Sequence, residues 1–498
     1  MSELMTHAPV LAILIPLLGA PLCALMRGNT VPWLFTTVLS ALSFYVSLQL
    51  LFHVAANGPV SYELGGWAPP WGIEYVADTL SSFVMLVISG ISTGVLLYAK
   101  ESIAAEVSSS RLGLFFAAYL LALTGMMGIT VTGDAFNIFV FMEIMSLSSY
   151  VLIAMGERND RRALTAAFQY LVIGTIGATF ILIGVGFLYL MTGTLNIADI
   201  ASQFDTISET RPARAAVGFL VVGIAIKLAM FPFHIWLPNA YSYAPNIVTA
   251  FFAGTATKVS VYLLIRFIFT VFGVDFSFGA LPLTELLLPL GVIAFLSMSL
   301  VAIFQDNLKR LLAFSSVAQL GYMTVGIALA SETGLTASIL HIFNHAIVKT
   351  GLFLSVGAIF FVTGSIYLKD LAGIGQRMPM TSFSFVLGGL ALIGVPLTPG
   401  FISKWYLLQA VLERGDMIGY SLAVGMLISS LFAVIYIWRI VELAYFKPSP
   451  EGTPSGEAPY SLLFPIWLFI LVSFYFGIET SYSAGFAEQA AKFLMGAP

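Results

Sequence analysis

The sequence has 498 residues, of which 59% are hydrophobic and only 9% are charged, and its formal net charge is −4. Soluble globular domains carry about a quarter charged residues, so this composition excludes that class and predicts a polytopic membrane protein. The single cysteine, Cys23, excludes an intrachain disulfide and a thiolate metal site, and we interpret it as packing in the first apolar segment.

Apolar segments of about 20 residues or more, long enough to cross a bilayer, recur along the whole chain. The first has no basic flank and no small-residue cleavage site, so we expect a retained helix and not a signal peptide. Fourteen transmembrane helices are predicted, at residues 8–26, 31–55, 75–98, 112–131, 133–156, 163–191, 214–237, 243–271, 282–304, 311–330, 335–363, 381–412, 417–446 and 460–479.

Lysines and arginines alternate between the two sides of these predicted helices. Of the 21, twelve follow odd-numbered helices, four lie on the opposite side, and five fall within helices. Because basic loops stay in the cytoplasm, both termini are predicted outside it. Asp306, Lys309 and Arg310, which follow helix 9, are interpreted as part of an ordinary basic cytoplasmic loop.

Five ionisable residues fall near the middles of predicted helices 5, 7, 8, 11 and 12. At 1.5 Å per residue the first four lie roughly 15–22 Å from their helix starts, and the fifth lies somewhat closer to the outer side. A charge at the bilayer centre costs roughly 3 kcal/mol, which makes such residues functional candidates. They predict a polar file in the membrane plane, formed by Glu143, Lys227, Lys258, Lys349 and Lys404.

Two of these lysines lie beside prolines that are expected to break their helices. Pro232 follows Lys227, and Pro396 and Pro399 precede Lys404. A proline removes a backbone donor and clashes one turn back, so carbonyl groups should be exposed near both lysines. Such irregular backbone is tolerated only beside protein or a water-filled cavity.

The stretch around the first break resembles a known family. Lys227, Pro232, His234, Trp236–Pro238, Ala244–Pro245 and Lys258 resemble the antiporter-like subunits shared by respiratory complex I, membrane-bound hydrogenases and Mrp-type multisubunit cation/proton antiporters, and most of all the D-type subunit of the Mrp antiporters. The helices around Glu143, around His345 and Lys349, and around Lys404, and the stretch 305–323, match the same family.

The resemblance implies a role for each matching residue. Glu143 is the expected partner of Lys227, and withdrawing it would let the lysine lose its proton; a purely structural ion pair is the alternative. His341, His345 and Lys349 recur every four residues on one helical face and correspond to a proton relay, although a satisfied core histidine is an equal alternative for His341. His234 corresponds to a gating or inlet histidine, with a structural cap as the equal alternative. Lys404 corresponds to the outward proton exit.

The resemblance also implies the architecture. Helices 4–8 and 9–13 would form two inverted five-helix repeats, each with one broken helix, 7 and 12. The expected segments are 1–111 for helices 1–3, 112–271 and 272–446 for the repeats, and 447–498 for helix 14 and a short tail. Tyr241 departs from the pattern, because complex I relatives often have histidine there.

The predicted function is that of a proton-translocating subunit of a multisubunit Na⁺ or other monovalent cation/H⁺ antiporter in the cell (inner) membrane. Its partners would be other subunits, protons, monovalent cations and lipid; no cofactor, catalytic activity of its own or nucleic acid is expected, since nucleotide and CxxC motifs are absent. An M-type or N-type subunit of complex I, without its own redox centre, or a hydrogenase homologue is the alternative. A haem oxidoreductase has too few candidate histidines, and a passive scaffold would leave about five buried charges uncompensated.

Overall fold

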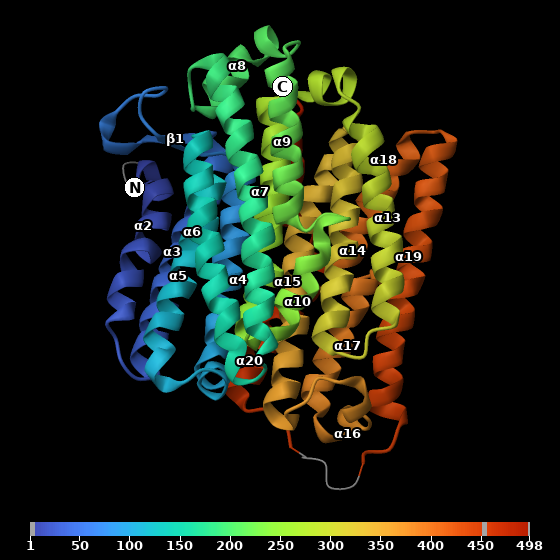
Figure 1. Ribbon diagram of the computed structural model, residues 1–498. Helices are drawn as coiled ribbons and strands as arrows, with labels where there is room; N and C mark the ends of the chain where they lie inside the picture. The colour runs from blue at the N-terminus through green and yellow to red at the C-terminus, as the bar shows by residue number, and fades with distance from the viewer. Residues whose placement is uncertain (1–4, 451–455, 497–498) are drawn as a thin grey trace.

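Helices cross the molecule side by side from one end to the other (Figure 1). The computed structural model describes residues 5–450 and 456–496. In these residues twelve helices are long and apolar enough to span a membrane, and two shorter apolar helices, α2 and α17, complete the predicted set of fourteen. The predicted class, an all-α polytopic membrane protein, is confirmed. The chain ends, residues 1–4, 497 and 498, lie outside the described residues.

The crossings follow the predicted order along the chain. They are α2 (Ala8–Ala24), α3 (Thr30–Asn57), α4 (Thr79–Glu106), α5 (Leu112–Val131), α6 (Ala135–Ala154), α7 (Arg162–Thr192), α9 (Arg211–Leu228) with α10 (Trp236–Tyr243), α11 (Asn246–Gly254) with α12 (Ala256–Ile265), α13 (Leu283–Ile303), α14 (Leu308–Ala328), α15 (Glu332–Thr363), α17 (Pro379–Ile393) with α18 (Pro399–Glu413), α19 (Met417–Val441) and α20 (Tyr460–Ile478).

The third helix was predicted at 75–98 but lies at Thr79–Glu106. Asp78 sets its start, because its side chain accepts the amide of Ser81 at 2.8 Å and the Ser81 hydroxyl accepts the Asp78 amide in return. This reciprocal arrangement is a capping box. Residues 74–77 instead form a strand, and the far end of α4 extends to Glu106, which therefore lies inside the bundle.

The two predicted breaks are confirmed. α9 ends at Leu228, where Ala229 takes a left-handed backbone conformation with φ 58°, and α10 begins only at Trp236. α17 ends at Ile393 and α18 begins at Pro399. A third break, which the sequence did not predict, separates α11 from α12 at Thr255, with φ −126° and ψ −60°.

Four features outside the crossings were also not predicted. Strands β1 (Val60–Glu63) and β2 (Glu74–Ala77) pair antiparallel, with Val60 opposite Ala77. α8 (Ile197–Ile207) is amphipathic and buries Ile197, Ile200, Phe204 and Ile207, a spacing that follows one helical face. α21 (Ser481–Leu494) packs against α15 and α4, whereas a short α16 (Ile374–Arg377) lies at the opposite end (Figure 1).

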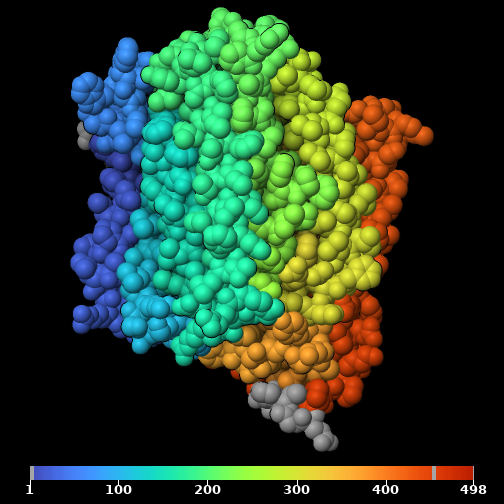
Figure 2. Space-filling model, in the orientation of Figure 1, coloured from blue at the N-terminus to red at the C-terminus, as the bar shows by residue number. Residues whose placement is uncertain are grey.

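α15 is the central helix. It packs against α4, α11, α14, α17, α18, α20 and α21, and the polar side chains in its middle, His341, His345 and Lys349, are buried. In contrast to the central α15, helices α6, α7 and α9 lie on an outer face of the molecule, with α7 packed between α6 and α9 (Figure 2). Glycines allow α7 and α9 to approach closely: a Cβ at Gly177 would lie 3.1 Å from the Gly223 carbonyl oxygen.

Candidate functional site: a row of buried charges

Lys227 lies in the last turn of α9, beside the first break, and is almost fully buried. Its Nζ donates a hydrogen bond of 2.7 Å to Oγ of Ser146 on α6. Space around this ammonium is tight, because a Cβ at Gly174 of α7 would lie 3.6 Å from Nζ and closer still to the Tyr150 hydroxyl oxygen. The break thus positions Lys227 against α6, as predicted.

Glu143 lies three residues before Ser146, on the preceding turn of α6. In the described residues no ion pair within 4.0 Å joins it to Lys227, and its Oε1 is buried without a hydrogen-bond partner. Glu143 and Lys227, the expected partners, are therefore not paired in this structure. The Ser146 hydroxyl accepts the hydrogen bond from Lys227 in place of the Glu143 carboxylate.

Lys258 lies one turn after the unpredicted break in helix 8 and is fully buried. Its Nζ donates to the carbonyl oxygen of Ala253, on the far side of the break. A helix end leaves its last carbonyl groups without intrahelical partners, so the interruption at Thr255 supplies an acceptor in the membrane interior. This explains how an unpaired lysine is accommodated on a fully buried helix.

Lys349, on α15, is also fully buried. Its Nζ donates to the Leu312 carbonyl oxygen at 2.8 Å and to the Ser315 hydroxyl, both on α14. α12, which carries Lys258, contacts α15, which carries Lys349, so the two lysines lie on neighbouring helices. No carboxylate within 4.0 Å pairs with either lysine in the described residues.

The two histidines of α15 differ in their surroundings. His341 is satisfied on both sides, with Nδ1 at 2.7 Å from Oγ of Ser403 and Nε2 at 2.9 Å from Oε1 of Gln319. His345 has no partner on either ring nitrogen, although it is buried. The two rings stack with their centroids 5.7 Å apart. His345 is therefore the residue of this pair whose ring nitrogens are free to accept or donate a proton.

Lys404 lies beside the second break. Its Nζ donates to the carbonyl oxygens of Ile393 at 2.8 Å and Leu392 at 3.3 Å, the last two residues of α17. The prediction that broken-helix carbonyl groups reach this lysine is confirmed. The negative end of the α17 dipole favours a cation here, and the Tyr322 ring, 5.1 Å from Nζ, adds a cation–π contact.

His234 lies in a short 3₁₀ turn, Phe233–Ile235, within the first break. Its ring stacks on Phe231 at 5.5 Å, and its Nδ1 is buried without a partner. Tyr241, which replaces the histidine of some relatives, donates its hydroxyl to the Phe252 carbonyl oxygen at 3.1 Å. His234 is thus at the break but makes no hydrogen bond to Lys227 in the described chain.

The predicted site residues fall into two groups. The first is Glu143 with Lys227, around α6 and the end of α9. The second lies around α15, which carries His341, His345 and Lys349 and contacts α12, with Lys258, and α18, with Lys404. His234, in the first break, belongs to neither group. Within the part of the chain that is described, no direct hydrogen bond or ion pair connects Lys227 with Lys258. A proton would need water or a side-chain movement to pass between the groups.

Comparison with known proteins identifies the family of this chain. Residues 132–431 match the family model "NADH:quinone oxidoreductase/Mrp antiporter, TM", a range that contains every predicted site residue. The chain belongs to this family.

Subunits of different membrane complexes are similar to this chain over almost its whole length. The N-type subunit of NADH-quinone oxidoreductase from Desulforudis audaxviator is 40% identical over 459 residues, 91% of this chain and 89% of that protein. The D-type subunit of the Na⁺/H⁺ antiporter from Bacillus subtilis is 29% identical over 496 residues, 99% of this chain and 98% of that protein. A chain in the structure of the Mrp complex from Dietzia sp. DQ12-45-1b superposes with a TM-score of 0.89 at 25% identity, covering 99% and 98% of the two chains.

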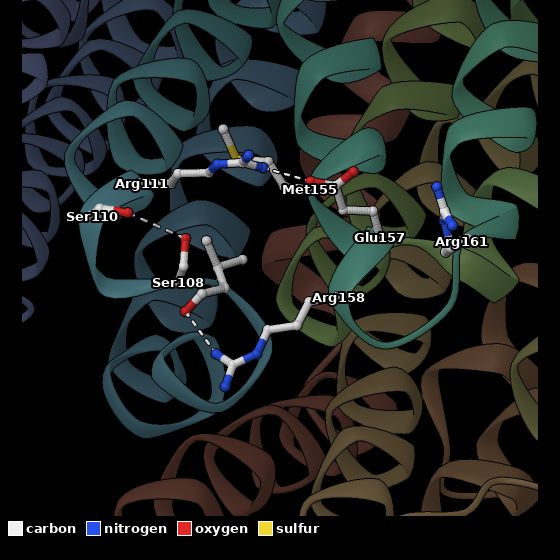
Figure 3. A pocket seen from close by; sticks show the side chains of 8 residues that line it. Ser108, Ser110, Arg111, Met155, Glu157, Arg158 and Arg161 are labelled. Carbon is white, nitrogen blue, oxygen red and sulfur yellow. Dashed lines mark hydrogen bonds and ion pairs between the residues drawn. The ribbon is translucent and has the colours of Figure 1, made fainter.

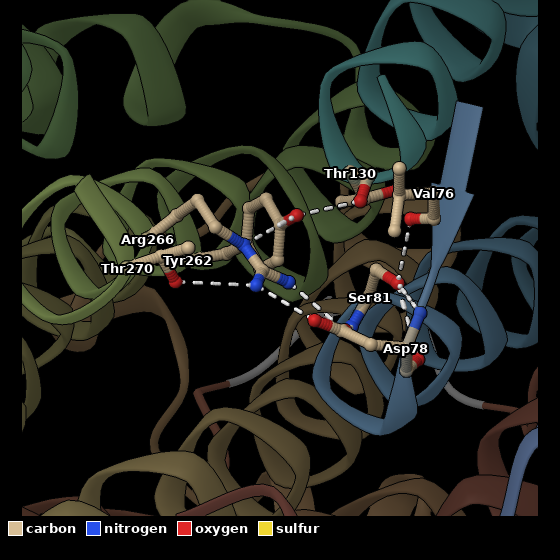
Figure 4. Close-up of polar contacts among 7 residues, drawn as sticks. All are labelled: Val76, Asp78, Ser81, Thr130, Tyr262, Arg266 and Thr270. Atoms are coloured by element: carbon tan, nitrogen blue, oxygen red, sulfur yellow. Dashed lines mark hydrogen bonds and ion pairs between the residues drawn. The ribbon is translucent and has the colours of Figure 1, made fainter. Parts of the chain in front are cut away.

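The sequence did not reveal a buried ion pair between Asp78, at the start of α4, and Arg266, which directly follows α12. Arg266 donates to both carboxylate oxygens of Asp78, at 2.7 and 2.9 Å, and also bonds the Tyr262 hydroxyl (Figure 4). Burial raises the pKa of the Asp78 carboxyl group, but the Arg266 guanidinium and the hydrogen bonds from Ser81 together hold this pKa below its ordinary value. Lys258, Tyr262 and Arg266 follow at intervals of four, a periodicity that could have drawn attention to Arg266.

A second polar cluster corrects the interpretation of Lys309 as part of an ordinary solvated loop. Lys309 is buried in the first turn of α14 and donates to the Ala244 carbonyl oxygen at 2.8 Å. Glu106, also buried, accepts the Asn246 amide at 3.0 Å and so caps α11. A cavity of about 200 Å³ lies beside both charges. Long-range packing places them inside the bundle, and sequence spacing carries no signal of it.

Proposed function

We propose that this chain is the proton-translocating subunit of a multisubunit monovalent cation/proton antiporter in the cell membrane. One observation carries the proposal: Lys227, Lys258 and Lys349 lie buried and Lys404 lies part-buried. None has an ion-pair partner in the described chain, and each is held by a carbonyl or hydroxyl oxygen. Unpaired charges in a membrane interior are costly and mark ion or proton pathways. Lysine in a dry site readily accepts and releases protons, and so does imidazole.

The chemistry proceeds by proton transfer between neighbouring groups. In the second group a proton passes from Lys258 through His345, whose ring nitrogens both lack a hydrogen-bond partner, to Lys349, His341 and Lys404. Lys404 then releases the proton toward the outer surface, because the break between α17 and α18 exposes backbone carbonyl groups that water can also bind.

Glu143 and Lys227 act as the switch of the first group. When the carboxylate approaches, it stabilises the charged lysine; when it withdraws, the proton is released toward Lys258. The arrangement with Lys227 on Ser146 and Glu143 unpartnered represents the withdrawn state. Movement of α6 by part of a turn would replace Ser146 by Glu143 as the hydrogen-bond acceptor of Lys227.

The two breaks support two inverted repeats, residues 112–271 and 272–446, flanked by 1–111 and 447–498. Each repeat contains a proline-associated break with a lysine beside it, between α9 and α10 and between α17 and α18. The first repeat also contains the break between α11 and α12. Basic residues concentrate on the loops after odd-numbered crossings, which supports a cytoplasmic location for those loops and an extracytoplasmic one for both termini.

The chain functions with partner subunits and has no redox chemistry of its own. Its end-to-end match to the D-type subunit of an Na⁺/H⁺ antiporter, 99% of one chain and 98% of the other, favours the antiporter. The 40% identity to the N-type subunit of a quinone oxidoreductase favours a second candidate, a proton-pumping subunit of a respiratory complex. Both candidates use the same buried row.

Everted membrane vesicles distinguish the two. Cells without other cation/proton antiporters would express the complete gene cluster, and a pH-sensitive dye would follow the transmembrane proton gradient after a respiratory substrate is added. An antiporter dissipates the gradient when Na⁺ or K⁺ is added, and Lys227→Ala abolishes that response. A complex that instead forms a gradient from NADH and quinone, with no response to cations, would contradict the antiporter and support the respiratory subunit.

A further inference from the structure

A basic cavity opens at the bundle end that carries the loops after odd-numbered crossings, away from the row of buried charges. It has a volume of about 470 Å³ and lies between the end of α4, the start of α5 and the turn that follows α6 (Figure 3). Its lining consists of Val107, Ser108, Ser110, Arg111, Met155, Glu157, Arg158 and Arg161.

Positive charge in this cavity exceeds negative charge, with three arginines against one glutamate. Arg111 pairs with Glu157 at 2.5 Å, and Arg158 donates only to the Val107 carbonyl oxygen at 3.5 Å. Arg161 makes no hydrogen bond or ion pair within the described chain. Two guanidinium groups therefore lack a carboxylate partner, while Ser108 and Ser110 add hydroxyl donors at the wall (Figure 3).

An exposed apolar strip leads from this cavity along the membrane-facing surface. Leu147 and Val151 of α6 are 56% and 47% exposed, and with the cavity residue Met155 they recur at intervals of four, on one helical face. Leu114, 55% exposed, lies one turn after Arg111 on α5. Cationic groups thus sit at the head of a surface on which acyl chains can lie.

We propose that this cavity binds the phosphate headgroup of an anionic phospholipid, whose acyl chains lie along the strip below. Guanidinium groups bind phosphate oxygens in a bidentate geometry, and basic pockets at the cytoplasmic ends of transmembrane helices are suited to such headgroups. The apolar strip selects a membrane lipid over free phosphate. Glu157 competes with the phosphate group for Arg111, because the two side chains form an ion pair when no headgroup is bound.

Binding can be measured on the full-length chain in the complex with which it purifies. The complex in phosphatidylcholine nanodiscs would be titrated with fluorescent phosphatidylglycerol. Arg161→Gln removes one cavity charge without breaking an internal contact and should weaken binding roughly five-fold. Glu157→Gln frees Arg111 and should strengthen binding by a similar factor. Lys369→Gln, an exposed residue on the same end but outside the cavity, is the matched control and should leave the affinity unchanged.

Opposite shifts in Arg161→Gln and Glu157→Gln support the proposal. Equal binding of phosphatidylcholine and phosphatidylglycerol, or no shift in either variant, would overturn it. Inorganic phosphate that displaces phosphatidylglycerol at an equal concentration would show that the cavity takes free phosphate, which overturns the lipid assignment. Size-exclusion profiles that match wild type establish that each variant is assembled.

Discussion

Replacing Asp78 by Asn isolates the contribution of the buried ion pair between Asp78, the N-cap of α4, and Arg266, directly after α12. The Asp78 and Arg266 side chains are 5% and 9% exposed, and they share two hydrogen bonds of 2.7 and 2.9 Å. Asn is as good a helix cap as Asp, so the capping bond to Ser81 is retained and only the charge is lost. A buried guanidinium then remains unpaired, at a cost of about 3–5 kcal/mol.

Thermal and denaturant unfolding of the purified complex would measure this loss. The double variant Asp78→Asn, Arg266→Gln should recover most of it, because no unpaired charge remains. Since the folded-state pKa of Asp78 lies below its ordinary value, the contribution of the pair is present above pH of about 4 and fades as pH falls through the folded pKa. The single variant should therefore differ least from wild type at the acidic end. A single variant within about 0.5 kcal/mol of wild type, or a double variant less stable than the single one, would refute this reasoning.

Three further predictions concern transport in vesicles, normalised to assembled complex. Lys258→Ala and Lys349→Ala should each strongly impair exchange, because either gap interrupts the row; activity retained in both would mean that protons take another route. Lys404→Glu should keep partial exchange with a shifted pH optimum, whereas Lys404→Leu should lose it, and the reverse order would indicate a packing role. Ser146→Ala removes the acceptor that holds Lys227 away from Glu143, a bond of about 1.5–3 kcal/mol, and should slow exchange roughly ten-fold; an unchanged rate would contradict the withdrawn state.

The sequence predicted features that depend on local chemistry. Apolar length indicated the crossings, and Pro232, Pro396 and Pro399 indicated two breaks, because proline disrupts a helix whatever surrounds it. The positions of Lys227 and Lys404 beside those two breaks could therefore also be predicted. The predicted contact of Lys404 with exposed carbonyl groups is present at Leu392 and Ile393.

Features that depend on distant contacts could not be predicted. The break at Thr255 contains no proline, and the partners Asp78 and Arg266 are 188 residues apart in sequence. Lys309 follows a basic loop pattern yet is buried, since Ala244, 65 residues away, supplies its acceptor. The Ser146 acceptor of Lys227 was missed because serine in an apolar helix usually bonds its own backbone.

Cation-driven proton exchange by Glu143→Ala and Lys227→Ala tests the proposed proton path most directly. The purified complex would be reconstituted in proteoliposomes that enclose a pH dye, and exchange would be started by a Na⁺ or K⁺ gradient. The matched control is the double variant Glu209→Ala, Arg214→Ala, which removes an exposed pair with side chains 79% and 46% accessible. Each buried substitution should abolish exchange while the control retains it. Near-normal exchange by either assembled Glu143→Ala or Lys227→Ala would contradict the proton path through these two residues.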